Sequence, residues 1–274
     1  MVTVRDAATV MLVRDRPDLE VLVLRRTPAA VFGPGATVFP GGAVDASDGA
    51  VFDRVTGLDD AAASVEHGVD AGGLAFRVAA VRESFEEAGV LLARDPSGNY
   101  GEPRAEWRDA LNAGHATFDR VLEADDLTIA AGDLRLFSHW LTPVGAPRRY
   151  NTWFFAAPAP EGYEAAHDDV ELVASAWVAP RELLELGARG EIELIFPTMR
   201  SLIALAHFRN AAELLDALDA VPRDDNGRPL VVADSSGERV RLPFDDAPAA
   251  AQWTIPLPDI SWRDEARLLA EELG

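Results

Sequence analysis

The sequence contains no cysteine and no lysine, and all 25 of its basic residues are arginine. Without cysteine the chain has no disulfides, no thiolate metal ligands and no cysteine nucleophile. The 46 acidic residues outnumber the arginines and give a formal net charge of −21. Such an acidic protein repels the phosphate backbone of nucleic acids, so we expect no nucleic-acid partner. An anionic substrate would need a metal ion and local arginines to offset the same field.

Long apolar runs are missing as well. No run approaches the roughly 18 apolar residues that predict a membrane span, and the N-terminus lacks the apolar core of a signal peptide. The C-terminus does not match the S-K-L peroxisomal address. We therefore expect a cytoplasmic protein with no membrane partner. With 274 residues, 48% of them hydrophobic, the chain can bury a full core, which predicts one enlarged globular domain.

The most informative segment is AFRVAAVRESFEEAGVLL, residues 75–92. At helical spacing its apolar residues share one side, which predicts a helix with a buried stripe. Glu83, Glu86 and Glu87 fall on the opposite side, which we expect to face water. Like charges at these spacings destabilise a helix by about a few tenths of a kcal/mol per pair. A hard cation such as Mg²⁺, in contrast, prefers clusters of carboxylate oxygens. Arg82 lies one turn before Glu86 and can orient its carboxylate.

An alanine- and glutamate-rich helix can also be an ordinary solvated surface element. The stretch VFGPGATVFPGG, residues 31–42, favours the metal site. Its glycines let the backbone approach a ligand closely, and its prolines stiffen the loop.

Residues 82–90, RESFEEAGV, resemble the core of the Nudix box, R-E-U-x-E-E-x-G-U, in which U is a bulky aliphatic residue. Ser84 departs from that pattern. The first half of the box is displaced upstream, where FPGG at 39–42 resembles its opening glycine pair and Asp48 stands where the family has glutamate. We interpret residues from about 49 to 73 as an insertion.

A split box of this kind resembles the peroxisomal coenzyme A diphosphatase branch of the Nudix superfamily. HWLTP, RRY and WFF, which begin at residues 139, 148 and 153, resemble the same branch. The resemblance implies an α/β protein: a Nudix α/β/α sandwich with a mixed sheet, helical insertions and a C-terminal extension. We expect a Nudix domain over residues 1–210, with insertions at about 49–73 and 100–130, and an extension packed on it over 211–274.

The resemblance also implies metal-dependent hydrolysis of a phosphoanhydride bond. The implied ligands of Mg²⁺ or Mn²⁺ are Glu83, Glu86, Glu87 and the backbone carbonyl of Gly42. Glu83 or Glu171 would act as the general base, and Arg82 would assist in the catalytic site. Either glutamate is compatible with the sequence.

The implied substrate is coenzyme A or acyl-coenzyme A. Val31 stands where coenzyme A-directed relatives carry arginine, and Thr27 where serine or alanine is usual, which keeps NADH or ADP-ribose as alternatives. A non-catalytic nucleotide-sensing module is a further alternative. Guanidinium groups suit phosphate oxygens, so the candidates for substrate binding are Arg25, Arg26, Arg148 and Arg149. For the first two, a solvated strand end is an equal interpretation.

Several other segments have regular patterns. We expect strands at 7–13, 19–24, 133–141 and 148–157, helices at 106–122, 195–208, 211–218 and 262–273, and a hairpin within 221–242. The 106–122 helix, broken near Gly114, covers the site or builds a homodimer contact. Trp153 and Phe155 share a face that suits core packing better than adenine stacking. We expect His67 at the surface and His139 in a structural role.

Overall fold

The computed structural model describes residues 3–29, 33–102, 104–142, 147–163 and 172–221. Glu171, the hairpin expected within 221–242 and the helix expected at 262–273 lie outside these residues. No helix in the described ranges is long and apolar enough to cross a membrane.

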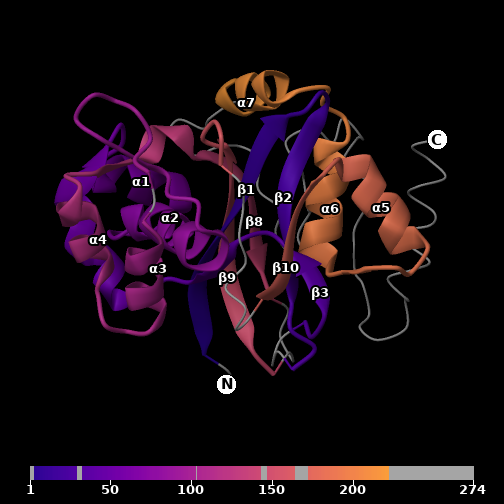
Figure 1. The fold of residues 1–274 in the computed structure, drawn as a ribbon, viewed down its shortest axis with the longest axis horizontal. Helices are drawn as coiled ribbons and strands as arrows, with labels where there is room; N and C mark the ends of the chain where they lie inside the picture. The colour runs from indigo at the N-terminus through magenta and orange to yellow at the C-terminus, as the bar shows by residue number, and fades with distance from the viewer. Residues whose placement is uncertain (1–2, 30–32, 103, 143–146, 164–171, 222–274) are drawn as a thin grey trace.

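The central element is a mixed sheet with strand order β11-β3-β2-β1-β9-β8 (Figure 1). These strands are Glu193–Leu194, Ala36–Val38, Leu19–Arg26, Val4–Asp15, Arg149–Pro158 and Arg135–Leu141. β1 runs parallel to β9 and antiparallel to β2. β4 (Gly41–Ala43) pairs with β1, and β10 (Leu172–Val178) pairs with β2.

The two central strands separate along their length, and this separation places the glycine pair. β1 pairs with β2 only near their shared turn, through Val13 and its neighbours. Further back along β1, the partner of Ala8 is Gly42 of β4. The edge of β1 that β2 leaves is therefore filled by the strand that carries Gly41 and Gly42.

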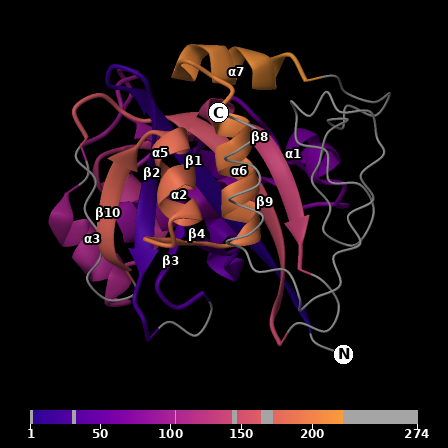
Figure 2. The ribbon, with the colours of Figure 1, turned by 90° about the vertical axis from the view of Figure 1, so that its right-hand side faces the viewer.

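Helices cover both faces of the sheet (Figures 1 and 2). One face carries α2 (Leu74–Ala88), packed with η1 (Ala46–Arg54), α1 (Asp60–His67), α3 (Ala105–Asn112) and α4 (Phe118–Ala124). The other face carries α5 (Pro180–Ala188) and α6 (Phe196–Leu205), while α7 (Ala211–Asp219) crosses one end. The predicted α/β sandwich with a mixed sheet is confirmed.

A small second sheet lies among the helices of the α2 side. It joins β5 (Val55–Thr56), β7 (Thr128–Ala130) and β6 (Ala93–Arg94), and η2 (Ala131–Asp133) follows β7. It thereby ties together segments before and after α2.

Alternation along β1 divides the core into two layers. Ala8, Val10 and Leu12 pack in the cluster of the α2 side, whereas Met11 and Val13 pack in the cluster of the α5 and α6 side. Successive strand side chains point to opposite faces, so a strand between two helix layers is apolar in a continuous run. Full burial of each large side chain contributes roughly 1.5–3 kcal/mol.

Most expected elements are present. The four expected strands correspond to β1, β2, β8 and β9, and the 195–208 and 211–218 helices correspond to α6 and α7. The expected break near Gly114 is also present, because α3 and α4 are separate helices and Gly114 between them has a φ of 70°.

Candidate metal centre and active site

α2 is buried on nearly every side, so the expectation of a water-facing glutamate side is wrong. Glu87 is only 7% exposed, and the side chains of Glu83 and Glu86 are 14% and 23% exposed. The apolar stripe packs on the sheet as expected. β4 and the segments before and after α2 cover the side that the helical pattern left to solvent.

The end of α2 explains one departure from the Nudix pattern. Gly89 ends the helix with a φ of 71°, a conformation that favours glycine. Ser84 is fully buried, and its hydroxyl donates to the carbonyl of Val90 at 2.9 Å. A bulky aliphatic side chain here would fill space but could not bond the chain as it leaves the helix.

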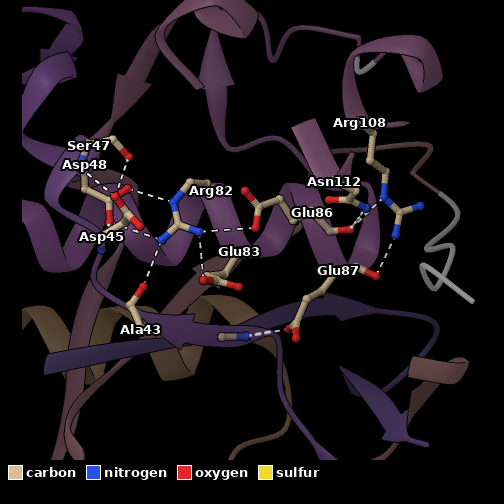
Figure 3. A network of polar contacts seen from close by, with 11 residues as sticks. Ala43, Asp45, Ser47, Asp48, Arg82, Glu83, Glu86, Glu87, Arg108 and Asn112 are labelled. Carbon is tan, nitrogen blue, oxygen red and sulfur yellow. Dashed lines mark hydrogen bonds and ion pairs between the residues drawn. The ribbon is translucent and has the colours of Figure 1, made fainter. Parts of the chain in front are cut away.

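Arg82 is the hub of the site (Figure 3). Its Nε and Nη2 donate to the Asp48 carboxylate at 2.8 and 3.1 Å, and Nη2 also donates to the Ala43 carbonyl at 2.9 Å. Its Nη1 donates to Glu83 at 2.8 Å and to Glu86 at 3.2 Å. Burial opposes its charge, but the bonds to Asp48 and the nearby carboxylates outweigh burial and raise the pKa of Arg82. Arg82 therefore orients two of the three glutamates.

Asp48 is buried against Arg82, whereas the residues next to it in the sequence are exposed. Its side chain is 1% exposed and accepts a bond from the amide of Asp45 at 2.7 Å, within a capping box that starts η1. The displaced first half of the Nudix box thus meets the second half through a buried ion pair. A carboxylate at this position is needed to hold the guanidinium still.

The glycine pair lets β4 touch α2 closely. The amide of Gly41 donates to Glu87 at 2.8 Å. A Cβ on Gly42 would lie 2.4 Å from the carboxyl carbon of Glu83, and one on Gly41 would lie 2.4 Å from the carbonyl oxygen of Ala8. A Cβ on Gly41 would clash with the backbone of β1, so only glycine fits there, and a Cβ on Gly42 would force the Glu83 carboxylate to move.

The carboxyl of Glu86 is strongly perturbed. Its pKa is raised to about 7, because burial and the neighbouring charge of Glu83 raise it more than Arg82 lowers it. Proton release from Glu86 is thus costly unless further positive charge is nearby.

The donor set fits a hard cation in its chemistry. Within the described ranges no three acidic or histidine side chains converge as a finished metal cage. The three glutamates bond separately, two with Arg82 and Glu87 with Gly41. Nevertheless, their carboxylates and nearby backbone carbonyls are the hard oxygen donors that Mg²⁺ and Mn²⁺ take, usually with waters completing the shell.

The predicted substrate arginines do not gather at the glutamates. Arg148 and Arg149 lie at the start of β9 and help to line a separate pocket of about 260 Å³ with Arg5 and Tyr150. Arg149 pairs with Val4 of β1, four positions from the partner of Gly42, which is ~13 Å along the strand.

Arg25 and Arg26 end β2, on opposite faces of the sheet because strand side chains alternate. Arg26 points to the same face as Leu22 and Leu24, which pack on the α2 side. Arg25 points to the opposite face, which α5 and α6 cover. Arg149 points to the same face as Trp153, which also packs on the α2 side. Arg26 and Arg149 are therefore the candidates on the face that carries the glutamates.

Sequence reasoning missed Arg108 and Asn112 of α3. Arg108 donates from Nε to the Glu86 carbonyl at 2.9 Å and from Nη2 to the Glu87 carbonyl at 2.7 Å. Asn112 donates to the Glu86 carbonyl at 3.2 Å. These side chains belong to a helix that follows the Nudix box, and nothing in their local pattern distinguishes them from other surface residues.

His67 is a correction, because it is 6% exposed and not at the surface. Its α1 helix packs it against Trp153 and Phe76, where Nε2 accepts from Arg77 at 3.2 Å. Burial, then the charges of Arg77 and His139, lower the pKa of His67 well below 6.5.

Trp153 and Phe155 are buried core residues, which confirms core packing. The ring of His139 stacks on Trp153 at 4.0 Å and its Nε2 contacts Asn151, so its role is structural.

Comparison with known proteins agrees with this architecture. The family model described as the NUDT19 Nudix domain matches residues 59–205. Human acyl-coenzyme A diphosphatase NUDT19 is 33% identical over 234 residues, which cover 71% of this chain and 62% of the human protein. The chicken protein of that name is 29% identical, covering 77% of this chain and 70% of its own length.

The crystal structure of a NUDIX hydrolase from Alicyclobacillus acidocaldarius superimposes with a TM-score of 0.69 at 32% identity. The match covers 80% of this chain and 97% of the bacterial one. The glycine pair, the Arg82 hub and these similarities together show that the chain belongs to the Nudix hydrolase family, with a Nudix domain of the NUDT19 type.

Proposed function

We propose that this protein hydrolyses the phosphoanhydride bond of coenzyme A or acyl-coenzyme A with the help of Mg²⁺ or Mn²⁺. The observation that carries the proposal is the buried Arg82 hub, which holds Glu83 and Glu86 beside the glycine pair of β4. The name of the human relative, acyl-coenzyme A diphosphatase, supports the substrate. The chain spans 62% of that relative's length, so the substrate is inferred for this domain alone.

The residues divide the work as follows. Glu83, Glu86, Glu87 and the carbonyl of Gly42 would hold the ion. When bound, the ion neutralises the diphosphate and lowers the pKa of a coordinated water. Arg82 keeps two of the carboxylates in place through buried bonds, which cost no rearrangement during the reaction.

A carboxylate would take the proton from the attacking water. Glu83 is one candidate, because it lies against Gly42 and bonds Arg82. Glu171, outside the described residues, is the other. Attack of water on one phosphorus breaks the P–O–P link and leaves 3′,5′-adenosine bisphosphate and 4′-phosphopantetheine.

Substrate binding needs positive charge in a protein of net charge −21. We propose Arg26 as the first candidate for this contact, because it lies on the sheet face that α2 covers, whereas Arg149 of the same face lies ~13 Å along β1 from the partner of Gly42. Arg25, Arg148 and Arg149 would attract the substrate from further away. A cytoplasmic location and a homodimer are further predictions from the sequence.

Hydrolysis of a panel of substrates by the purified protein tests the proposal. Coenzyme A, acyl-coenzyme A, NADH and ADP-ribose would each be incubated with Mg²⁺ and with Mn²⁺, and the products resolved by mass. We expect the bisphosphate from coenzyme A and from its acyl derivative. Val31 and Thr27 keep a dinucleotide substrate as the second candidate, which cleavage of NADH or ADP-ribose alone would support. Metal binding without any turnover would indicate a sensing module.

A further inference from the structure

The last turn of α2 has backbone carbonyls that the helix itself cannot satisfy, as every helix end does. The two residues after the helix, Gly89 and Val90, donate their amides to carbonyls one turn back at 2.9 and 3.2 Å. The carbonyls of Glu86 and Glu87 lie beyond their reach. Because these two residues are also proposed metal ligands, whatever satisfies their carbonyls also holds the backbone from which the carboxylates project.

The partner is the guanidinium of Arg108, which spans both carbonyls at once (Figure 3). The two bonds, 2.9 Å to Glu86 and 2.7 Å to Glu87, use two nitrogens of one planar group. Asn112, one helical turn further along α3, adds a bond of 3.2 Å to the Glu86 carbonyl. Water could satisfy a carbonyl, but it could not fix the two at a set spacing. A planar fork does so, because its nitrogens have a rigid geometry.

The charge of Arg108 also suits this end of the helix. The C-terminal end of a helix carries the negative end of its dipole, and a cation there is stabilising. The same turn bears the carboxylates of Glu86, which bonds Arg82, and of Glu87, which bonds the amide of Gly41. Arg108 therefore holds the backbone of this turn, while Arg82 and Gly41 orient the carboxylates of Glu86 and Glu87.

α3 is itself held in place independently of this contact. Its Trp107 and Leu111 pack against the core cluster that contains α2. Arg104, which precedes α3, also bonds Asp125 at the end of α4 through Nε at 2.9 Å, but this half-exposed ion pair adds little to the anchoring. Arg108 thus extends from an anchored helix, so its position can define that of the α2 end.

We propose that Arg108 is a positioning residue for the metal site, and that α3 belongs to the active-site framework of this enzyme. This inference rests on the proposed function, because it assumes that Glu86 and Glu87 bind the ion. Misplacement by about 1 Å from a distant change can cost 100-fold in rate. Loss of the fork would let the last turn of α2 shift, which would alter both carboxylates together.

The test measures Mn²⁺ affinity of the full chain by electron paramagnetic resonance, without substrate. For Arg108→Gln we expect the dissociation constant for Mn²⁺ to rise about 10- to 100-fold, as is typical when a residue that supports metal ligands is lost. Arg108→Lys keeps the charge but loses the planar fork, so its dissociation constant for Mn²⁺ should lie between those of the wild type and Arg108→Gln. Asn112→Ala removes one of the three bonds to the Glu86 and Glu87 carbonyls, so it should weaken Mn²⁺ binding least. It replaces Arg108→Gln in the test if that variant does not fold.

Arg104→Gln is the matched control. It removes the same charge from the same segment and breaks a half-exposed ion pair with Asp125, and within the described ranges Arg104 forms no hydrogen bond or ion pair with α2. It should bind Mn²⁺ as the wild type does. Equal weakening in Arg104→Gln and Arg108→Gln, or affinity within twofold of wild type for Arg108→Gln, would overturn the positioning role. If the wild type itself binds no Mn²⁺, the metal assignment fails first, and this inference falls with it.

Discussion

Two buried arginines on α2, Arg77 and Arg82, lie five residues apart and bond different numbers of carboxylates within the described residues. Within the described residues, Arg77 bonds the carboxylate of Glu66 at 2.7 Å and the ring of His67 at 3.2 Å. Arg82 bonds three carboxylates, which leaves the group two negative charges in excess when all are ionised. The aromatic rings of Trp153, Phe155 and Phe76 enclose the Arg77 group.

The difference distinguishes a structural ion pair from the proposed metal site. The enclosed Arg77–Glu66 pair joins α1 to α2 within the core. A group with excess negative charge is stabilised by a cation, and burial, opposed by Arg82 and reinforced by the charge of Glu83, raises the pKa of its Glu86 to about 7. Two arginines of the same helix thus have different roles, which depend on the number of carboxylates that each one bonds.

The largest effect should come from Arg77→Met. It leaves the carboxylate of Glu66 buried without its partner, a change that typically costs about 3–5 kcal/mol of unfolding free energy. Urea unfolding followed by circular dichroism measures the loss. The Mn²⁺ affinity of the folded fraction should be unchanged, because the Arg82 group is intact. The double variant with Glu66→Gln should recover part of the stability, and a weaker Mn²⁺ affinity in Arg77→Met would remove the distinction between the two arginines.

Next come Glu86→Gln and Glu87→Gln. Because loss of residues that merely support metal ligands costs about 10- to 100-fold, loss of a ligand should lower kcat by more than about 100-fold. The glutamine at 87 can still accept the bond from Gly41, so the thermal midpoint should change little. Steady-state kinetics at saturating Mg²⁺ gives the rate. Near-normal turnover in both variants would contradict the metal assignment.

Gly42→Ala should have an intermediate effect. Its Cβ would meet the Glu83 carboxylate at 2.4 Å, so the carboxylate or β4 must move. We expect kcat to fall by about 10- to 100-fold, the range for disturbed metal surroundings. Gly49→Ala is the control, because a Cβ there meets no atom within 4 Å. An unchanged rate in Gly42→Ala would show that close contact between β4 and Glu83 is not required.

The smallest effect concerns pH and the Arg77 group. The pKa of His67 in the folded protein lies below the unfolded value of about 6.5, so below that pH the unfolded chain binds a proton that the folded chain excludes. Stability should therefore fall as pH drops below 6.5, by about 1.4 kcal/mol per pH unit until the folded pKa is reached. The charges of Arg77 and His139 add to the effect of burial on the pKa of His67.

His67→Gln supplies the comparison for this slope. Urea midpoints between pH 5 and 7 should vary less with pH in the variant than in the wild type. Equal slopes would assign the acid sensitivity to other groups, such as the carboxylates around Arg82.

The sequence by itself determined the local elements and the chemical type of the site. The apolar spacing of α2, the terminal Gly89 and the alternation of β1 are local signals, since each depends on the 3.6- or 2-residue period of one element. The Nudix box added Arg82 and the three glutamates, whose spacing places them on one side of a helix.

Only the tertiary structure decided which charges are buried and what holds them. Asp48 meets Arg82 across 34 residues and Gly41 meets Glu87 across 46, through packing that no local period encodes. The burial of His67 and the grip of Arg108 likewise depend on where α1 and α3 pack against α2. Side-chain environment is set by neighbours distant in sequence, and for that reason the helical pattern predicted a solvent-exposed side for glutamates that the folded protein buries.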